Sequence, residues 1–487
     1  MFKKKYILIT FLAIFSMSFI VGLAIFDDKR DNIPDSIERF IPSSVKKFLV
    51  ENIFYKKKLY ASIERLRKRV SNKDKELKSE NKIVDKLLDE LYSMGLSNLK
   101  FFKVKNEEQI ISKNSKIFKI STFQTDYLSI GTWPHTKASA YLDIYENQIF
   151  LVSKNGIISF FNIDSIEKEK FEAKILQSNI KEIVNYEGFY SHGGKGIKDI
   201  LIDKNRIFVT YSNLLSKDCY NTSILVAEIN FEYLNFEKYF DPPSCVSVRK
   251  GYNRWSDNAA GGRLVKFKDD NYLFSHGGFK TRVKAQDDSS VVGKILKINN
   301  LTKNWNIISK GHRNVQGLFY DEKGDFILST EHGPQGGDEI NLNNLKNNTP
   351  KNFGWPISSY GEHYGGKSEL NSENYKEAPL HKSHSEYGFI EPIKHFVPSI
   401  GITEIKKIPI EFNFEFINDY FIGSMGNNLQ EGDLSIHQIR LNMDNNEIIY
   451  SDILGIGERV RDILFIEKIN KFILFLENTA SIAILEN

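Results

Sequence analysis

The sequence predicts an all-β fold, a six-bladed β-propeller, preceded by an N-terminal transmembrane helix and a long coiled-coil helix. From about residue 100 onward, short runs of alternating apolar and polar residues recur, as in "YLDIYENQIFLVS" and "RDILFIEKINKFILFLEN", and this is the periodicity of half-buried strands. Several runs share one pattern, an apolar strand, a tight turn such as "DEKGD" and a second apolar strand, repeated roughly every fifty to seventy residues. An array of two-sheet sandwiches would give similar strands, but the repeated hairpin favours the propeller. The region 100–487, about 390 residues, suits six blades.

The first 30 residues are predicted to be a membrane anchor. Lysines at positions 3–5 precede residues 6–26, an apolar run of 21 residues without a charge before Asp27. At 1.5 Å per residue, such a helix can cross a bilayer core of about 30 Å. The basic flank should remain cytoplasmic, which places the rest of the chain on the extracytoplasmic (periplasmic) side. A signal peptide cleaved near Ala24 is the alternative, and either reading predicts an exported chain.

A long helix is predicted over residues 43–95, which contain no proline and no glycine before Gly95. Its apolar residues follow the alternating four- and three-residue spacing of heptads, interrupted by Lys73 and Glu80. This pattern predicts a coiled-coil stalk through which copies of the chain could associate as a homo-oligomer. An amphipathic helix lying on the membrane or on the following domain is the alternative. The apolar positions are Leu59, Ile63, Leu66, Val70, Leu77, Val84, Leu87 and Leu91.

The net charge of +4 is concentrated in the predicted stalk. Residues 46–90 contain 14 Lys and Arg against 8 Asp and Glu, so the remainder of the chain is close to neutral. A near-neutral body lacks the basic surface that binds phosphates, so we expect no nucleic-acid partner.

Two cysteines, Cys219 and Cys245, lie in the exported part of the chain. An even number of cysteines in an oxidising compartment permits one disulfide. Two free buried thiols are the alternative.

Two polar, glycine-rich stretches indicate a ligand site. They are "GHRNVQGL" at 311–318 and "EHGPQGGDEIN" at 331–341, and each combines charged, amide or imidazole side chains with glycines that allow a ligand to approach the backbone. Further pieces occur in the order "GGKGIKDILID", "GGRLVKFKDD", then these two stretches, then "GERVRDI". Together they resemble the soluble sugar dehydrogenases that depend on pyrroloquinoline quinone, the glucose/sorbosone dehydrogenase family. The resemblance covers roughly residues 110–485 and implies a six-bladed propeller, a sugar substrate, and pyrroloquinoline quinone and calcium as cofactors.

The resemblance also implies roles for individual residues. Arginine can hold a carboxylate of the quinone bidentately, and amide side chains can donate to its oxygens. The carbonyl groups of Gly333 and Pro334 would hold the calcium ion that polarises the quinone, since calcium prefers oxygen ligands. Asp338 and Glu339 match a second, structural calcium position. The cofactor-binding positions are Arg313, Asn314, Gln316, His332, Arg459 and Arg461.

The sequence departs from the family pattern at the reacting centre. The family's general base, a histidine, stands four residues before the arginine of "GGRL", and here that position is Ala259. Alanine cannot accept a proton, so Asp257 and His276 are the candidate substitutes. Gly194 stands where the family has a cofactor-binding glutamine. The sequence therefore leaves open a sugar dehydrogenase with altered base chemistry, a catalytically inactive propeller that binds a ligand or a partner, and a scaffold assembled through the stalk.

Overall fold

The structure is a computed structural model that describes residues 98–125, 136–185, 189, 195–216, 219–247, 259–279, 281–346, 349–365, 372–412 and 416–487. These residues belong to one compact unit, Ser97–Asn487. The predicted anchor (1–30) and stalk (43–95) lie outside the described residues, so both stay predictions. In the described part of the chain, no helix is long and apolar enough to cross a membrane.

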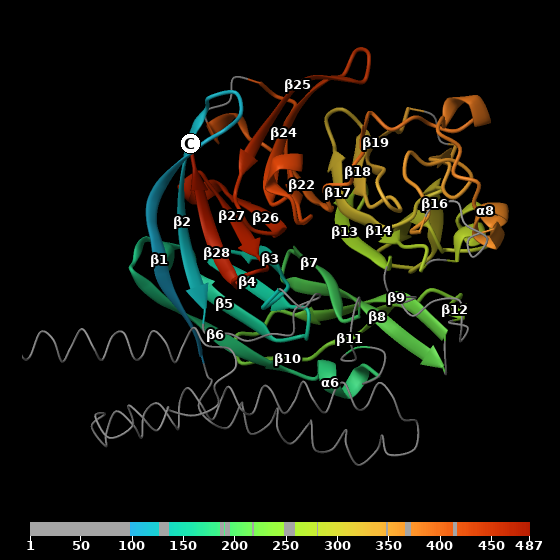
Figure 1. Ribbon diagram of the computed structural model, residues 1–487. Helices are drawn as coiled ribbons and strands as arrows, with labels where there is room; N and C mark the ends of the chain where they lie inside the picture. Colours follow the sequence, from blue (N-terminus) through green and yellow to red (C-terminus); the bar gives the residue numbers. More distant parts are fainter. Residues whose placement is uncertain are drawn as a thin grey trace, which may run out of the picture. The chain divides into compact units, whose positions relative to one another are not determined.

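Antiparallel strands form most of this unit, in groups that follow one another along the chain (Figure 1). The first three groups are β3 (Ala140–Tyr145), β4 (Gln148–Ser153), β5 (Ile158–Asn162) and β6 (Lys170–Ser178); β7 (Ile197–Asp203), β8 (Arg206–Ser216), β9 (Cys219–Glu228) and β11 (Glu237–Phe240); and β13 (Gly261–Phe267), β14 (Asn271–His276), β15 (Lys294–Asn299) and β16 (Trp305–Lys310). The next two are β17 (Val315–Asp321), β18 (Phe326–Glu331), β19 (Asp338–Asn344) and β21 (Lys394–Phe396); and β22 (Ile402–Lys407), β23 (Asp419–Ser424), β24 (Ser435–Asn442) and β25 (Glu447–Gly455). Short elements at the margins include β10 (Tyr233–Leu234), β12 (Val246–Ser247), β20 (Lys351–Asn352), α6 (Ile180–Ile183) and α8 (Ser372–Glu377).

The last group contains strands from both ends of the unit. It consists of β26 (Val460–Ile466), β27 (Lys471–Leu476) and β28 (Ser481–Glu486), and β28 pairs with β2 (Ile117–Thr125). The adjoining strand β1 (Asn98–Ile111) pairs with β2 and also with β6, so it joins the last group to the first. Figure 1 shows β1 and β2, in blue, beside the red β28. This pairing nearly closes the sheet system and covers strand edges that would otherwise be exposed.

The first strands of the groups lie next to one another in a ring. The neighbours are β3 and β7, β7 and β13, β13 and β17, β17 and β22, β22 and β26, and finally β26 and β3. Apolar side chains fill the space between adjacent groups, as where Phe208 and Ile224 pack with Leu264 and Phe274. The fold is therefore all-β and propeller-like, as the sequence predicts, and its packed groups hold the inner strands around one axis.

Cys219 and Cys245 form a disulfide, with their Cα atoms 5.5 Å apart. The bond connects the start of β9 to the residue before β12, a strand that itself pairs with β9. Of the two interpretations of the cysteines, the structure has the disulfide.

Candidate functional site

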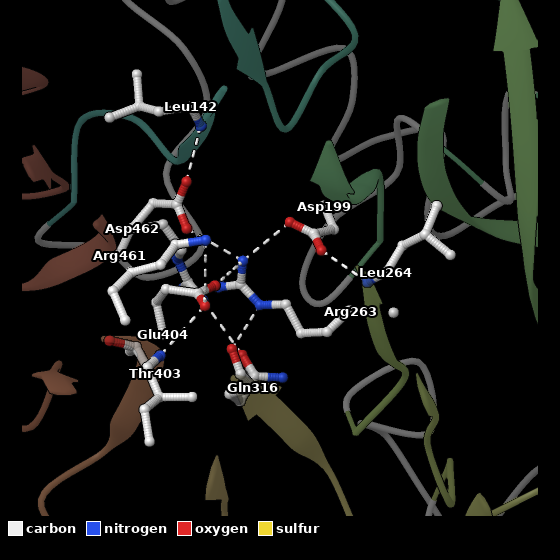
Figure 2. Close-up of polar contacts among 12 residues, drawn as sticks. Leu142, Asp199, Arg263, Leu264, Gln316, Thr403, Glu404, Arg461 and Asp462 are labelled. Atoms are coloured by element: carbon white, nitrogen blue, oxygen red, sulfur yellow. Dashed lines mark hydrogen bonds and ion pairs between the residues drawn. The ribbon is translucent and has the colours of Figure 1, made fainter. Parts of the chain in front are cut away.

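The inner strands bring four buried charged side chains to one point. Arg263 of β13 donates through Nη1 to Asp199 of β7 at 2.9 Å and to Asp462 of β26 at 3.1 Å. The same nitrogen lies 2.5 Å from Glu404 Oε2 of β22, and Nε donates to the carbonyl oxygen of Gln316 on β17. Figure 2 shows the guanidinium group between these partners. We call Arg263, Asp199, Glu404 and Asp462 the central charge cluster.

The central charge cluster links all six inner strands. Asp462 also accepts a hydrogen bond of 2.7 Å from the backbone amide of Leu142 on β3, and the guanidinium of Arg263 lies 5.2 Å from the ring centroid of Tyr141. In five of the six strands, the pairing register shifts within the first residues. Such bulges redirect side chains. The four charged side chains are 3–6% exposed, so the cluster connects the strands rather than facing solvent.

Three carboxylates surround one guanidinium in the central charge cluster. Burial raises the pKa of Asp199 to about 6 and that of Glu404 to about 7, although Arg263 opposes both shifts. Burial alone would lower the pKa of Arg263, but the three carboxylates outweigh burial and raise it well above its usual value. Asp199 and Glu404 therefore favour their protonated forms more than solvent-exposed acids do, while Arg263 stays charged.

A chain of polar side chains adjoins the cluster at Gln316 and contains four of the predicted cofactor-binding residues. Gln316 Oε1 accepts from Arg461 Nη1 at 3.3 Å, and Gln316 Nε2 donates to Asn314 Oδ1 at 3.1 Å. Asn314 Oδ1 also accepts from the backbone amide of Gly261 at 3.1 Å, and Asn314 Nδ2 lies 3.4 Å from His332 Nδ1. We call Arg461, Gln316, Asn314 and His332 the polar chain. The structure thus brings together residues that lie up to 147 positions apart in the printed sequence.

His332 is held as a neutral imidazole. Its Nε2 lies 2.7 Å from the carbonyl oxygen of Ile402, so Nε2 must carry the hydrogen, and Nδ1 then accepts from Asn314. Burial lowers the pKa of His332, which also favours the neutral form. Both ring nitrogens contact the protein, so a ligand would contact the carbon atoms or the face of the imidazole ring.

Arg459 and Arg461 share one carboxylate. Glu477, which follows β27 and is 0% exposed, accepts from Arg459 Nε at 2.9 Å and from Arg461 Nε at 2.6 Å. Burial would raise the pKa of Glu477, but the two arginines outweigh it and lower that pKa to about 2. Arg459 also donates to the carbonyl oxygen of Met425. One positive charge in excess therefore remains beside the polar chain, where it favours an anionic ligand.

Arg313 lies at the other end of the polar chain. Its Nη1 donates to the carbonyl oxygen of His332 at 2.8 Å, and its guanidinium lies 5.5 Å from the ring centroid of Trp355. No carboxylate within the described ranges forms a salt bridge with Arg313. Arg313 also shares a hydrogen bond with the side chain of Tyr364 and interacts electrostatically with Asp338 and Glu331. Its remaining donors can bind a carboxylate of a ligand.

The turn at Gly333 and Pro334 presents two backbone carbonyl groups. The amide of Gly333 donates to Asp338 Oδ1 at 3.1 Å, which fixes the turn, and Asp338 Oδ2 accepts from the amide of Ile402 at 3.0 Å. Among the residues that the structure describes, no hydrogen bond occupies the carbonyl oxygens of Gly333 and Pro334. They keep the oxygen atoms that a hard cation prefers as ligands.

Asp338 and Glu339, the predicted second calcium position, hold contacts within the protein. Both oxygens of Asp338 bind backbone amides, and Glu339 Oε2 accepts from Asn341 Nδ2 at 3.3 Å. In the described segments, no group of three or more His, Cys, Asp or Glu side chains could hold a metal ion. These two acids connect parts of the protein to one another.

The position expected to hold a general base borders the polar chain. Ala259 is 8% exposed and stands two residues before Gly261, whose amide donates to Asn314. Its φ of +66° lies in the left-handed region, which few residues other than glycine adopt. The side chain of Ala259 itself therefore offers no proton acceptor at this position, near Asn314. Asp257, one predicted substitute, lies outside the described residues, as does Gly194.

The structure places His276, the other predicted substitute, on β14 with both ring nitrogens against the backbone. Its Nε2 accepts from the backbone amide of Thr222 at 3.2 Å, and its Nδ1 lies 3.0 Å from the carbonyl oxygen of Gly277. Burial lowers the pKa of His276 to about 4. The ring is 1% exposed, so neither nitrogen is available to a substrate.

Sequence reasoning missed Asp199, Glu404, Asp462 and Glu477 because each is a single acid in an ordinary strand pattern. A signal was nevertheless present for the first three. Each is the third residue of its inner strand, as is Arg263 in β13. Aligning the six hairpin repeats by their inner strands would have placed these charges in one layer.

The family model described as Glucose / Sorbosone dehydrogenase matches residues 144–482. An uncharacterised protein of Synechocystis sp. is 30% identical over 226 residues, which cover 42% of this chain and 50% of that protein. Aldose sugar dehydrogenase YliI of Escherichia coli is 27% identical over 199 residues, which cover 36% of this chain and 50% of that protein. The matched region thus spans about half the length of these curated relatives.

The fold is similar to that of a solved structure, the soluble aldose sugar dehydrogenase (Asd) from Escherichia coli in the apo-form. The TM-score is 0.55 at 18% sequence identity, and the match covers 75% of this chain and 99% of that chain. At this identity the likeness concerns the fold alone.

Proposed function

Because the chain belongs to the glucose/sorbosone dehydrogenase family, we propose that it is a quinoprotein aldose dehydrogenase built on a six-bladed propeller. It would oxidise a sugar with pyrroloquinoline quinone and calcium. The observation that carries this proposal is the polar chain, flanked by arginines whose charge exceeds that of their carboxylate partner.

The donor set at this place fits a quinone that bears several carboxylates. Arg313 offers its remaining donors at one end, and Arg459 with Arg461 contributes one excess positive charge at the other. Asn314 and Gln316 supply amide groups between them. When bound, the quinone would take up the two electrons that the sugar loses. Calcium would bind at the Gly333–Pro334 turn, whose carbonyl groups are the oxygen ligands that this ion prefers.

The proposal does not assign the group that accepts the proton from the sugar. A histidine at the position of Ala259 would stand next to the polar chain, but alanine cannot take a proton. Asp257 remains the candidate base, since His276 is engaged on both nitrogens. The same observation favours a second candidate function, a catalytically inactive propeller that binds the quinone or a partner without turnover.

The location of the protein is also proposed. The apolar run over residues 6–26 and the lysines before it support a membrane anchor with the propeller on the extracytoplasmic side. The disulfide between Cys219 and Cys245 supports export, because disulfides persist in oxidising compartments. Association of copies through residues 43–95 would hold the propellers together.

The two candidate functions differ in one experiment on the full chain, purified in detergent. Pyrroloquinoline quinone and calcium are added, and binding is followed by the quenching of tryptophan fluorescence. A panel of aldoses then follows, with the absorbance of the quinone as the readout. Binding with reduction supports the dehydrogenase, and binding without reduction for every aldose supports the inactive propeller. Absence of binding, in a sample that unfolds cooperatively, contradicts both.

A further inference from the structure

His384 lies where the sequence predicts part of a second calcium site. Its Nδ1 lies 2.9 Å from the carbonyl oxygen of Phe353, and its Nε2 lies 3.4 Å from Glu339 Oε1, within ion-pair distance but without hydrogen-bond geometry. The side chain is fully buried, at 1% exposed. One imidazole ring therefore stands between a carboxylate and a carbonyl, two groups that a calcium ion would otherwise use as ligands.

The protein fixes this ring from several sides. Glu391 Oε1 accepts from the backbone amides of His384 and Ser385, each at 2.8 Å, at the start of the short helix η5 (Ser385–Tyr387). Glu391 Oε2 accepts from the hydroxyl group of Tyr360 at 2.8 Å, and the Tyr360 ring is stacked on the His384 ring with centroids 5.4 Å apart. The backbone and the ring plane of His384 are thus held by one carboxylate and its partners.

Gly354 provides the space for the ring. A Cβ atom at this position would lie 2.9 Å from His384 Nδ1 and 2.1 Å from Ser358 Oγ, and the φ of Gly354 is +87°. Any larger residue would displace the imidazole from the carbonyl group of Phe353. The local backbone is therefore built around the histidine side chain.

We propose that the side chain of His384, and not a calcium ion, joins the segment that follows β20 to Glu339 on β19. Calcium needs several oxygen ligands at about 2.3–2.6 Å, and it cannot contact both Glu339 and the Phe353 carbonyl while the ring separates them. The other oxygen of Glu339 is bound to Asn341. The contact of the His384 ring with Glu339 and the Phe353 carbonyl group thus connects these two segments without a metal ion. It does not depend on the quinone or on calcium at the Gly333–Pro334 turn.

Calcium stoichiometry tests this inference. Equilibrium dialysis of the full chain in detergent, with radioactive calcium alone, compares the wild type with Glu339→Gln. We expect the same number of bound ions per chain, whereas one ion fewer in Glu339→Gln would overturn the proposal. If no calcium binds at the Gly333–Pro334 turn, the number of bound ions per chain is lower by one in both proteins. Failure of that proposed calcium site is therefore distinguishable from failure of this inference.

Thermal unfolding in the presence of EGTA gives the second measurement. His384→Ala should lower Tm by about 2–4 °C, because it leaves buried polar groups without partners. His381→Ala is the matched control, since His381 lies in the same segment and its ring is stacked on Tyr387 at 3.9 Å. Equal Tm values for the two variants would contradict the inference. If His384→Ala does not fold, the number of calcium ions bound by Glu339→Gln in the dialysis still tests the proposal.

Discussion

Replacing Arg263 with leucine tests whether the central charge cluster holds the inner strands together. The substitution leaves Asp199, Glu404 and Asp462 buried at one point without their shared cation. Removing one partner of a buried ion pair typically costs about 3–5 kcal/mol. Asp199 and Glu404 can take up protons, because burial already raises the pKa of Asp199 to about 6 and that of Glu404 to about 7. We therefore expect Arg263→Leu to lower the free energy of unfolding by about 3 kcal/mol near pH 6 and by about 5 kcal/mol near pH 8.

The expected shift in Tm follows from the size of the unit. Ser97–Asn487 unfolds with an entropy of roughly 0.8 kcal/mol/K at about 2.1 cal/mol/K per residue, so the loss corresponds to a decrease of roughly 4–6 °C. Urea unfolding followed by tryptophan fluorescence measures the same loss as a lower midpoint.

The control for this substitution is an exposed ion pair. Lys105→Ala removes the partner of Glu108, and the two side chains are 54% and 52% exposed. Exposed pairs contribute about 0–1 kcal/mol, so this midpoint should hardly change. Adding Glu404→Leu to Arg263→Leu removes one of the unpaired carboxylates and should recover part of the loss. If Arg263→Leu unfolds at the same urea concentration as Lys105→Ala, the cluster does not stabilise the ring of strands.

Four further outcomes are expected. Ala259→His should raise sugar oxidation by about 10²- to 10⁴-fold, since it restores a general base, and intact quinone binding with unchanged turnover would place the defect elsewhere. Arg461→Gln should weaken quinone binding at least tenfold in a fluorescence titration, because it removes the excess positive charge, and an unchanged Kd would exclude this arginine from the site. Cys219→Ser should lower the free energy of unfolding by about 3–4 kcal/mol for a sequence separation of 26, and equal stability of oxidised wild type and variant would argue against the disulfide. The raised pKa of Glu404, about 7 against 4.5, means that the folded protein binds more protons than the unfolded chain between these values, so stability falls as pH rises through that window. Glu404→Gln should flatten this pH dependence, and an unchanged slope would refute the assignment.

Much of the fold could be predicted from local patterns. The alternation of apolar residues gives the strands, and turns such as "DEKGD" give the hairpins, because both depend on residues close together in the chain. Closure of the sheet system by β2 against β28 was not predictable in this way. That pairing joins Lys119 to Glu486, and nothing in either segment alone specifies a partner so far along the chain.

The candidate site was likewise predictable only in part. The sequence by itself indicated that Arg313, Asn314, Gln316 and His332 belong together, since they lie in two neighbouring polar, glycine-rich stretches. Only the tertiary structure decided that Glu477 neutralises half of the charge of Arg459 and Arg461, and that His276 is engaged by a backbone amide from another group of strands. The central charge cluster is the plainest case, because its four side chains come from four separate hairpins. Whether a lone acid is a solvated surface charge or a buried partner of Arg263 depends on which strands the fold brings to the axis, and burial then sets its pKa and its contribution to stability.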